Sequence, residues 1–106
     1  MIDYTVKLSK QAASDMTDIY NYIAYELSVP KTAMQQFDRI ATAIDTLSTL
    51  PTRIKIMSDA YSQRNELRQL TVDNYSVIFT ISGTTIFIVR VLYSSSDLSF
   101  RLKKFN

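Results

Sequence analysis

The chain has 106 residues, 46% apolar and 21% charged, with one Gly and two Pro. This size and composition are typical of an ordered globular protein, so we predict a single domain over residues 1–106. The absence of Cys and His excludes disulfides, Ser–His and Cys–His catalysis and most metal centres, and we expect neither a metal nor a cofactor. The N-terminus lacks the apolar core of a signal peptide, and no stretch approaches about 18 apolar residues. We therefore expect a cytoplasmic protein without membrane contact.

Charge is distributed unevenly along the chain. Residues 1–50 hold four Lys or Arg and six Asp or Glu, net −2, whereas residues 51–106 hold eight and four, net +4. Such asymmetry suggests a polyanionic partner for the second half, although chance alone can produce it with so few charges. Without His or Cys, any catalysis would depend on cations, Tyr, carboxylates or hydroxyls, a set that fits metal-free phosphoryl chemistry.

The first half has the pattern of one strand and two helices. Apolar and polar residues alternate over residues 3–8, which predicts a half-buried strand, and Ser9 is a suitable N-cap for a following helix of roughly 18 residues. Pro30 fits the first turn of a second helix, which Leu50-Pro51 ends. Because their connection is short, the helices should form an antiparallel hairpin. Their apolar stripes are Ala12, Met16, Ile19, Tyr20, Ile23 and Leu27, and Ala33, Phe37, Ile40, Ala41, Ile44 and Leu47.

The second half has the pattern of a loop followed by an antiparallel three-strand meander. Asp73-Asn74 and Ser82-Gly83 are favourable turn sequences between apolar runs. The segments are a loop over residues 52–63, with at most a short extended piece at 54–57, strands over 66–70, 75–81 and 85–93, and a short C-terminal helix or tail over 98–105.

The apolar faces of these strands indicate how they pack. In the middle strand Tyr75, Val77, Phe79 and Ile81 share the face expected to contact the helices. The last strand is apolar on both faces, so a further strand, residues 3–8, should pair along its far side. We therefore predict an α+β fold of order β-α-α-β-β-β. A helical hairpin packs on one face of a small, mostly antiparallel sheet, and the opposite face is left for a partner.

Basic residues gather around the first meander strand. Arg64, Glu66 and Arg68 are expected on one face of that strand, turned away from the hairpin, with Arg53 and Lys55 just before it. Guanidinium groups bind phosphates bidentately, so this cluster suits RNA-backbone binding and stabilisation of a pentavalent phosphorane. A solvated strand with cross-strand ion pairs is the alternative.

Three further side chains stand near the predicted strand ends. Tyr75 is expected in the core with its hydroxyl at the surface. Tyr93 could transfer a proton, stack on a base or serve only packing. Arg90 is expected to share a face with Ile86, Ile88 and Leu92, and either to pair with a carboxylate, Glu66 or another, or to point into the partner surface.

The order and spacing of several motifs resemble the RelE/ParE superfamily of bacterial toxins over nearly the whole chain. These motifs are a strand followed by Ser-x-x-Ala-x-x-Asp from Ser9, Leu-Arg-x-Leu at residues 67–70, Asn-Tyr at 74–75, and Arg-Val-x-Tyr at 90–93 followed by Asp97. The resemblance implies the toxin of a type II toxin–antitoxin system, neutralised by a cognate antitoxin with an acidic segment.

The resemblance implies one of two activities. RelE-like members cleave mRNA on the ribosome, with the RNA 2′-hydroxyl as nucleophile, and ParE-like members inhibit DNA gyrase without catalytic residues. Our leading hypothesis is a ribosome-dependent mRNA endonuclease; the alternatives are a gyrase inhibitor, which would use the helical hairpin and C-terminal tail, and a degenerate antitoxin-binding member. The implied catalytic residues are Arg68, Tyr93 and Glu66, and the implied RNA-binding residues are Arg53, Lys55, Arg64 and Arg90.

Two positions depart from the ribonuclease pattern. The residue after the Asn-Tyr pair is often Arg in the ribonucleases but is Ser76 here, and the Arg that commonly precedes the final Asp is Ser96. Each substitution removes a cation from the implied phosphate site, where such groups typically contribute a few kcal/mol to transition-state stabilisation.

Overall fold

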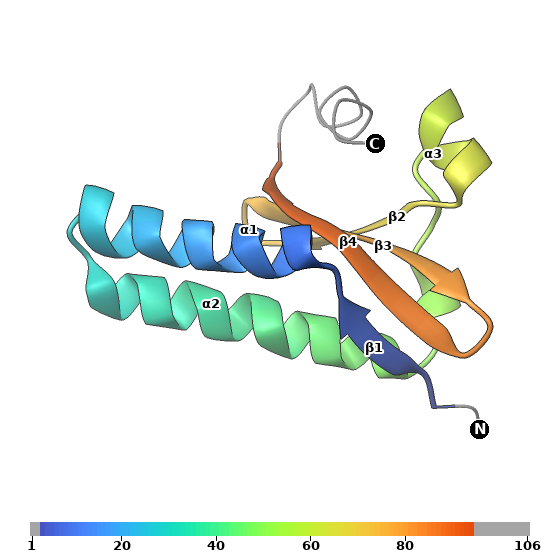
Figure 1. Cartoon of the computed structure of the whole chain (residues 1–106), viewed down its shortest axis with the longest axis horizontal. Helices are drawn as coiled ribbons and strands as arrows, with labels where there is room; N and C mark the ends of the chain where they lie inside the picture. Colours follow the sequence, from blue (N-terminus) through green and yellow to red (C-terminus); the bar gives the residue numbers. More distant parts are fainter. Residues whose placement is uncertain (1–2, 95–106) are drawn as a thin grey trace.

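A computed structural model describes residues 3–94 of the chain (Figure 1). The elements follow the predicted β-α-α-β-β-β order, with short helical turns added between them. They are β1 (Thr5–Leu8), α1 (Lys10–Asn21), the π-helical turn η1 (Tyr22–Glu26), α2 (Pro30–Asp45), the 3₁₀ turns η2 (Thr46–Ser48) and η3 (Pro51–Arg53), α3 (Ala60–Asn65), β2 (Arg68–Val72), β3 (Tyr75–Ser82) and β4 (Thr85–Tyr93).

The helical hairpin forms as predicted. The Ser9 hydroxyl caps α1 by accepting a hydrogen bond from the Ala12 N–H at 2.9 Å. Ser28, at φ 57°, takes a left-handed conformation between the two helices, and Pro30 occupies the first turn of α2. Figure 1 shows α1 and α2 side by side along their whole length.

The four strands form one mixed sheet of order β1-β4-β3-β2. β1 pairs in parallel with β4, from Thr5 opposite Thr85 to Leu8 opposite Ile88, and the other two pairings are antiparallel. The predicted partner for the far side of the last strand is therefore confirmed. Asp73 at φ 55° and Gly83 at φ 60° supply the left-handed positions that tight hairpins require.

The main core lies between the hairpin and the sheet, on the predicted face of β3. Val77 and Phe79 are fully buried there, with Tyr75 and Ile81 packed at its margin. Its buried members are Ala12, Met16, Ile40, Ile44, Leu47, Val77, Phe79, Ile86, Ile88 and Val91.

A second apolar cluster covers part of the opposite sheet face, which sequence reasoning left open for a partner. Leu67, Ile78 and Leu92 are buried there, with Met57 and Tyr61 packed against them. Tyr61 belongs to α3, so the prediction of a loop over residues 52–63 is wrong in this part. Asp59 begins α3 as its N-cap, accepting a hydrogen bond from the Ser62 N–H at 2.9 Å; a helix of six residues is too short to give a periodic pattern.

A bulge in β4 changes the faces of its second half. Ile78 lies opposite Arg90, but the next residue, Phe79, lies opposite Ile88, so Val89 is an extra residue. The expectation that Ile88 and Arg90 share a face is therefore wrong. Within residues 3–94 no helix is long and apolar enough to cross a membrane. The predicted helix or tail over residues 98–105 lies outside the described residues.

Candidate functional site

The expected basic cluster does not assemble on one sheet face. Glu66 is not in a strand: it ends α3 in a left-handed conformation at φ 52°. Arg64 lies exposed in the last turn of the same helix, and Lys55 is exposed beyond η3. The prediction of one strand carrying Arg64, Glu66 and Arg68 is therefore wrong, because β2 begins only at Arg68.

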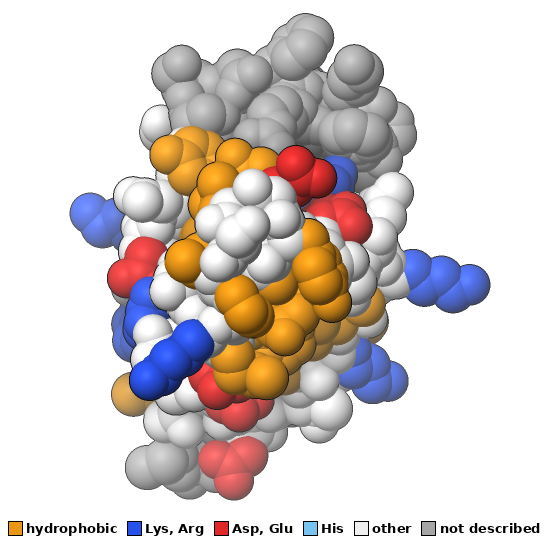
Figure 2. All heavy atoms as spheres, turned by 90° about the vertical axis from the view of Figure 1, so that its left-hand side faces the viewer, with side chains coloured by type: hydrophobic (Ala, Val, Ile, Leu, Met, Phe, Trp, Pro, Cys, Tyr) orange, Lys and Arg blue, Asp and Glu red, His pale blue; other side chains and the backbone are white. Residues whose placement is uncertain are grey.

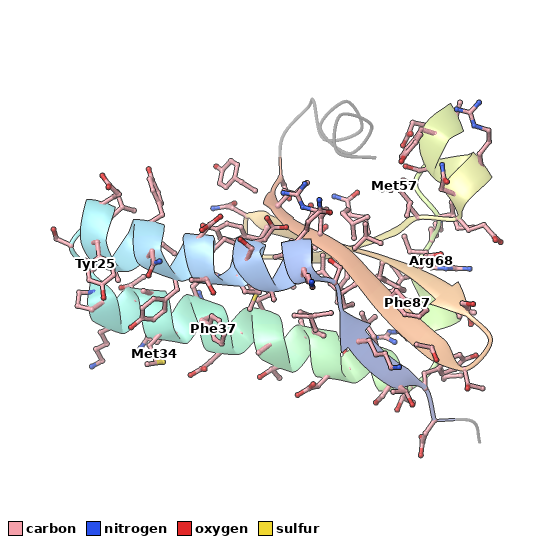
Figure 3. All side chains as sticks on the ribbon, in the orientation of Figure 1. Tyr25, Met34, Phe37, Met57, Arg68 and Phe87 are labelled. Carbon is pink, nitrogen blue, oxygen red and sulfur yellow. The ribbon has the colours of Figure 1, made fainter. Side chains whose placement is uncertain are left out.

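Arg68 points to the side of the sheet opposite to the one predicted. It lies across from Phe79, a core residue on the hairpin side. Its guanidinium donates a hydrogen bond to the Ile54 carbonyl, and its Nε is buried without a hydrogen-bond partner among the described residues. This placement could have been read from the sequence, since Arg68 has the same strand parity as Leu70 and Val72. Figure 3 shows Arg68 at the end of the molecule opposite to Tyr25.

Arg53 also serves the local backbone. Its guanidinium donates hydrogen bonds to the carbonyls of Thr49 at 2.8 Å and Leu50 at 3.0 Å, and to the Thr46 hydroxyl at 3.1 Å. These bonds hold the turns between α2 and the meander. Arg53 is exposed, but its donors are directed at the chain itself.

Arg90 pairs with a carboxylate, one of the two alternatives left open, and the carboxylate is Asp15. Its Nε and terminal nitrogen donate to Asp15 at 2.7 and 2.9 Å, and the Val91 N–H donates to the same carboxylate at 3.0 Å. The carboxylate raises the pKa of Arg90, so this guanidinium stays charged. Together with the hydrogen bond from the Ser9 hydroxyl to the Val89 carbonyl, the pair fixes α1 to β4.

Sequence reasoning missed the role of Asp15. The signal was the Ser-x-x-Ala-x-x-Asp spacing from Ser9. Residues three apart lie on one helix face, and here Ser9 and Asp15 both bond to β4 while Ala12 is fully buried between them.

The two strand-end tyrosines meet. Tyr75 and Tyr93 lie opposite each other across β3 and β4, with ring centroids 5.7 Å apart in an edge-to-face contact. Tyr93 is 56% exposed. Burial raises the pKa of Tyr75, and the neighbouring phenols of Tyr93 and Tyr22 raise it further.

A groove of about 600 Å³ opens beside these tyrosines, between α1 and the end of the sheet. Its walls combine aromatic rings with the Asp15–Arg90 pair and the exposed carboxylate of Asp18. The lining residues are Asp15, Asp18, Ile19, Tyr22, Tyr75, Arg90, Val91, Leu92 and Tyr93. We call this feature the tyrosine groove.

Of the implied catalytic set, only Tyr93 lies at the tyrosine groove. Arg68 pairs with Phe79 and Tyr93 with Tyr75, so the two side chains start roughly 13 Å apart along the strands and about 10 Å apart across them. Ser76, where ribonucleases often have Arg, is fully buried; its hydroxyl bonds to the Gln69 amide at 2.7 Å and to the Ser94 hydroxyl. Ser96 lies outside the described residues, and among those described no cluster of three acidic side chains could hold a metal ion.

The hairpin tip is the second notable surface. Its apolar side chains are between 41% and 74% exposed, and Figure 2, which views the molecule from this end, shows them as a group. Exposed aromatic and Met side chains are typical of protein contacts. The group consists of Tyr22, Tyr25, Leu27, Val29 and Met34.

The fold and the match to a family model place the chain in the RelE/ParE superfamily of toxins. Residues 6–98 match the family described as the ParE toxin of the type II toxin–antitoxin system parDE, and the chain belongs to this family.

Solved structures share the fold, and two of them are toxin–antitoxin systems. The chromosomal ParDE toxin–antitoxin system from P. aeruginosa matches with a TM-score of 0.74 at 21% identity, over 87% of this chain and 97% of that one. The toxin–antitoxin complex RelBE2 from Mycobacterium tuberculosis matches with a TM-score of 0.62 at 21% identity, over 89% and 94%. No curated protein sequence is significantly similar to the chain.

Proposed function

We propose that this toxin acts by binding its target, DNA gyrase, and not by cleaving RNA. The observation that carries the proposal is that the arginines implied in RNA binding and catalysis bond to groups of the protein itself. Arg53, Arg68 and Arg90 donate hydrogen bonds within the protein, and Glu66 lies outside the strands.

Metal-free RNA cleavage needs a different arrangement. A base must reach the 2′-hydroxyl, and cationic donors must surround the phosphate within hydrogen-bond distance. Here Arg68 and Tyr93 lie on two strands separated by β3, roughly 13 Å apart along the strands, and Arg68 donates to the Ile54 carbonyl. A binding toxin needs no such set, and the exposed apolar hairpin tip offers a surface of the kind that contacts proteins.

We also propose a cognate antitoxin as the neutralising partner. The family is that of a toxin–antitoxin system, and both matching structures are described as toxin–antitoxin assemblies. The net charge of +4 over residues 51–106 suits an acidic antitoxin segment.

A supercoiling assay tests the proposed target. The purified toxin should inhibit DNA supercoiling by gyrase, and addition of the antitoxin should restore it. In parallel, primer extension on mRNA in a purified translation reaction should show no new cleavage, with a cleaving RelE-like toxin as the positive control. Full gyrase activity at a large molar excess of toxin would refute the proposal.

The ribosome-dependent endonuclease stays as a second candidate because of Tyr93. Its exposed phenol ends β4 beside Tyr75, where it could transfer a proton or stack on a base. If mRNA is cut in the translation reaction, Tyr93→Phe and Arg68→Ala identify the side chains responsible. Antitoxin binding without effect on either target would indicate a degenerate member.

A further inference from the structure

Three tyrosines from separate elements converge on the tyrosine groove. Tyr22 begins η1, Tyr75 begins β3 and Tyr93 ends β4. All three line the groove, and the edge-to-face contact of Tyr75 with Tyr93 fixes two of the rings. Burial raises the pKa of Tyr75 and the phenols of Tyr93 and Tyr22 raise it further, in agreement with three phenols close together. The groove therefore presents aromatic rings and phenol hydroxyls.

The charged groups of the groove favour a cation. Asp15 and Arg90 neutralise each other through two hydrogen bonds. Asp18 lines the same groove, is exposed and leaves a surplus negative charge. The charged lining residues are Asp15, Asp18 and Arg90, two negative and one positive, so the net charge of the groove is −1. Aromatic faces next to a carboxylate bind ammonium and guanidinium groups, whereas a phosphate would be repelled.

We propose that the tyrosine groove binds an arginine or lysine side chain carried on a segment of a partner protein. The cation lies against the rings of Tyr22, Tyr75 and Tyr93 with Asp18 as its counter-ion. A volume of about 600 Å³ accommodates such a side chain together with its apolar neighbours. The groove is separate from the exposed basic side chains Lys55 and Arg64, which suit acidic segments.

Matched peptides test the requirement for positive charge. The probes are acetyl-Leu-Arg-Leu-amide and the same peptide with citrulline, which keeps the shape of arginine but not its charge. Binding to the full-length toxin is followed by NMR. We expect saturable shifts of the ring signals of the three tyrosines, and a Kd about tenfold lower for the arginine peptide than for the citrulline peptide. Equal affinities, or no binding of either peptide, would overturn the proposal.

Variants test the two recognition elements separately. Asp18→Asn should weaken binding of the arginine peptide about two- to fivefold, whereas Asp38→Asn, which removes an exposed carboxylate of α2 that does not line the groove, should leave it unchanged. Tyr22→Leu should weaken binding and Tyr22→Phe should retain it, because the phenyl face remains. An unchanged Kd in Asp18→Asn refutes the proposal that Asp18 is the counter-ion of the bound cation.

One further variant tests whether the cation comes from a partner protein or from the basic C-terminal residues of this chain. Arg101, Lys103 and Lys104 are changed together to Gln in the full chain, and the arginine peptide is titrated again. An unchanged Kd supports a partner as the source of the cation. Binding about tenfold tighter would mean that the chain's own basic residues compete with the peptide for the groove. This result would overturn the proposal of a partner protein.

Discussion

Two ion pairs join helices to the sheet, and they differ in burial. Asp15 and Arg90 connect α1 to β4 with side chains only 11% and 12% exposed, whereas Arg39 and Asp73 connect α2 to the β2–β3 turn with side chains 54% and 44% exposed. Both have short contacts, 2.7 and 2.8 Å. Distance alone therefore does not distinguish them.

The difference lies in what happens when one partner is lost. A buried charge that loses its partner keeps its desolvation cost and becomes strongly unfavourable, whereas an exposed charge returns to water. The buried pair also lines the tyrosine groove, so the position of α1 and the shape of that groove depend on the same contact. We expect the buried pair to specify the structure and the exposed pair to add little.

The largest expected effect is that of Asp15→Ala. It leaves the Arg90 guanidinium and the Val91 N–H without their carboxylate, and we expect a loss of about 3–5 kcal/mol in the free energy of unfolding. Urea denaturation at pH 7 measures it. Asp18→Ala, one turn further along α1 and exposed, is the control and should change stability by less than about 0.5 kcal/mol. A loss of under about 1 kcal/mol in Asp15→Ala would contradict the comparison.

Ser76→Arg adds a guanidinium at a buried position whose hydrogen-bond partners, Gln69 and Ser94, are not carboxylates. We expect a loss of roughly 2–4 kcal/mol from overpacking and an unpaired charge, and no gain of mRNA cleavage. Thr71→Arg is the matched control, because Thr71 lies directly opposite Ser76 on β2 but is exposed. Stable folding of Ser76→Arg with new mRNA cuts would show that this position accepts the ribonuclease residue.

The double change Asp15→Leu with Arg90→Met removes both charges of the buried pair. We expect a smaller loss than in Asp15→Ala, about 1–2 kcal/mol, because only the Val91 N–H is left without a partner. Urea denaturation of Asp15→Leu, Arg90→Met and the double variant side by side gives the coupling energy of the pair. If the double variant is as unstable as Asp15→Ala, the ion pair contributes net stability, in addition to fixing the position of α1 on β4.

The fold was largely predictable because its signals are periodic. Three- and four-residue spacing in the first half gives the hairpin, and alternation in residues 75–81 gives the correct core face. The apolar run in β4 correctly required a strand on its far side. These patterns reflect burial on one or both faces, which sequence records directly.

The candidate site was less predictable because it depends on single insertions and long-range pairs. The extra residue Val89 reverses the faces of β4 without changing its apolar character. The six-residue helix α3 moves Glu66 out of the sheet. The partner of Arg90, Asp15, is 75 residues away, and many carboxylates were equally possible from sequence. Charge counts locate most basic residues in the second half of the chain but do not indicate the direction of any guanidinium.

The smallest expected effect is that of Asp73→Asn in the exposed pair. Hydrogen bonds from Arg39 at 2.8 Å and Gln36 at 3.0 Å lower the pKa of the Asp73 carboxyl. Because the pKa of Asp73 is lower in the folded state than in the unfolded chain, the carboxylate stabilises the fold fully above the unfolded pKa, about 3.9. This stabilisation is lost as the pH falls through the folded-state pKa. Asn retains the left-handed backbone of this turn, so the substitution tests charge alone. We expect a Tm about 1–3 °C lower than wild type at pH 7 and a smaller difference at pH 3, measured by circular dichroism. If the difference in Tm between Asp73→Asn and wild type grows on acidification, the sign of the linkage is opposite to the expected one. If the loss of stability is as large as in Asp15→Ala, the distinction between buried and exposed ion pairs is wrong.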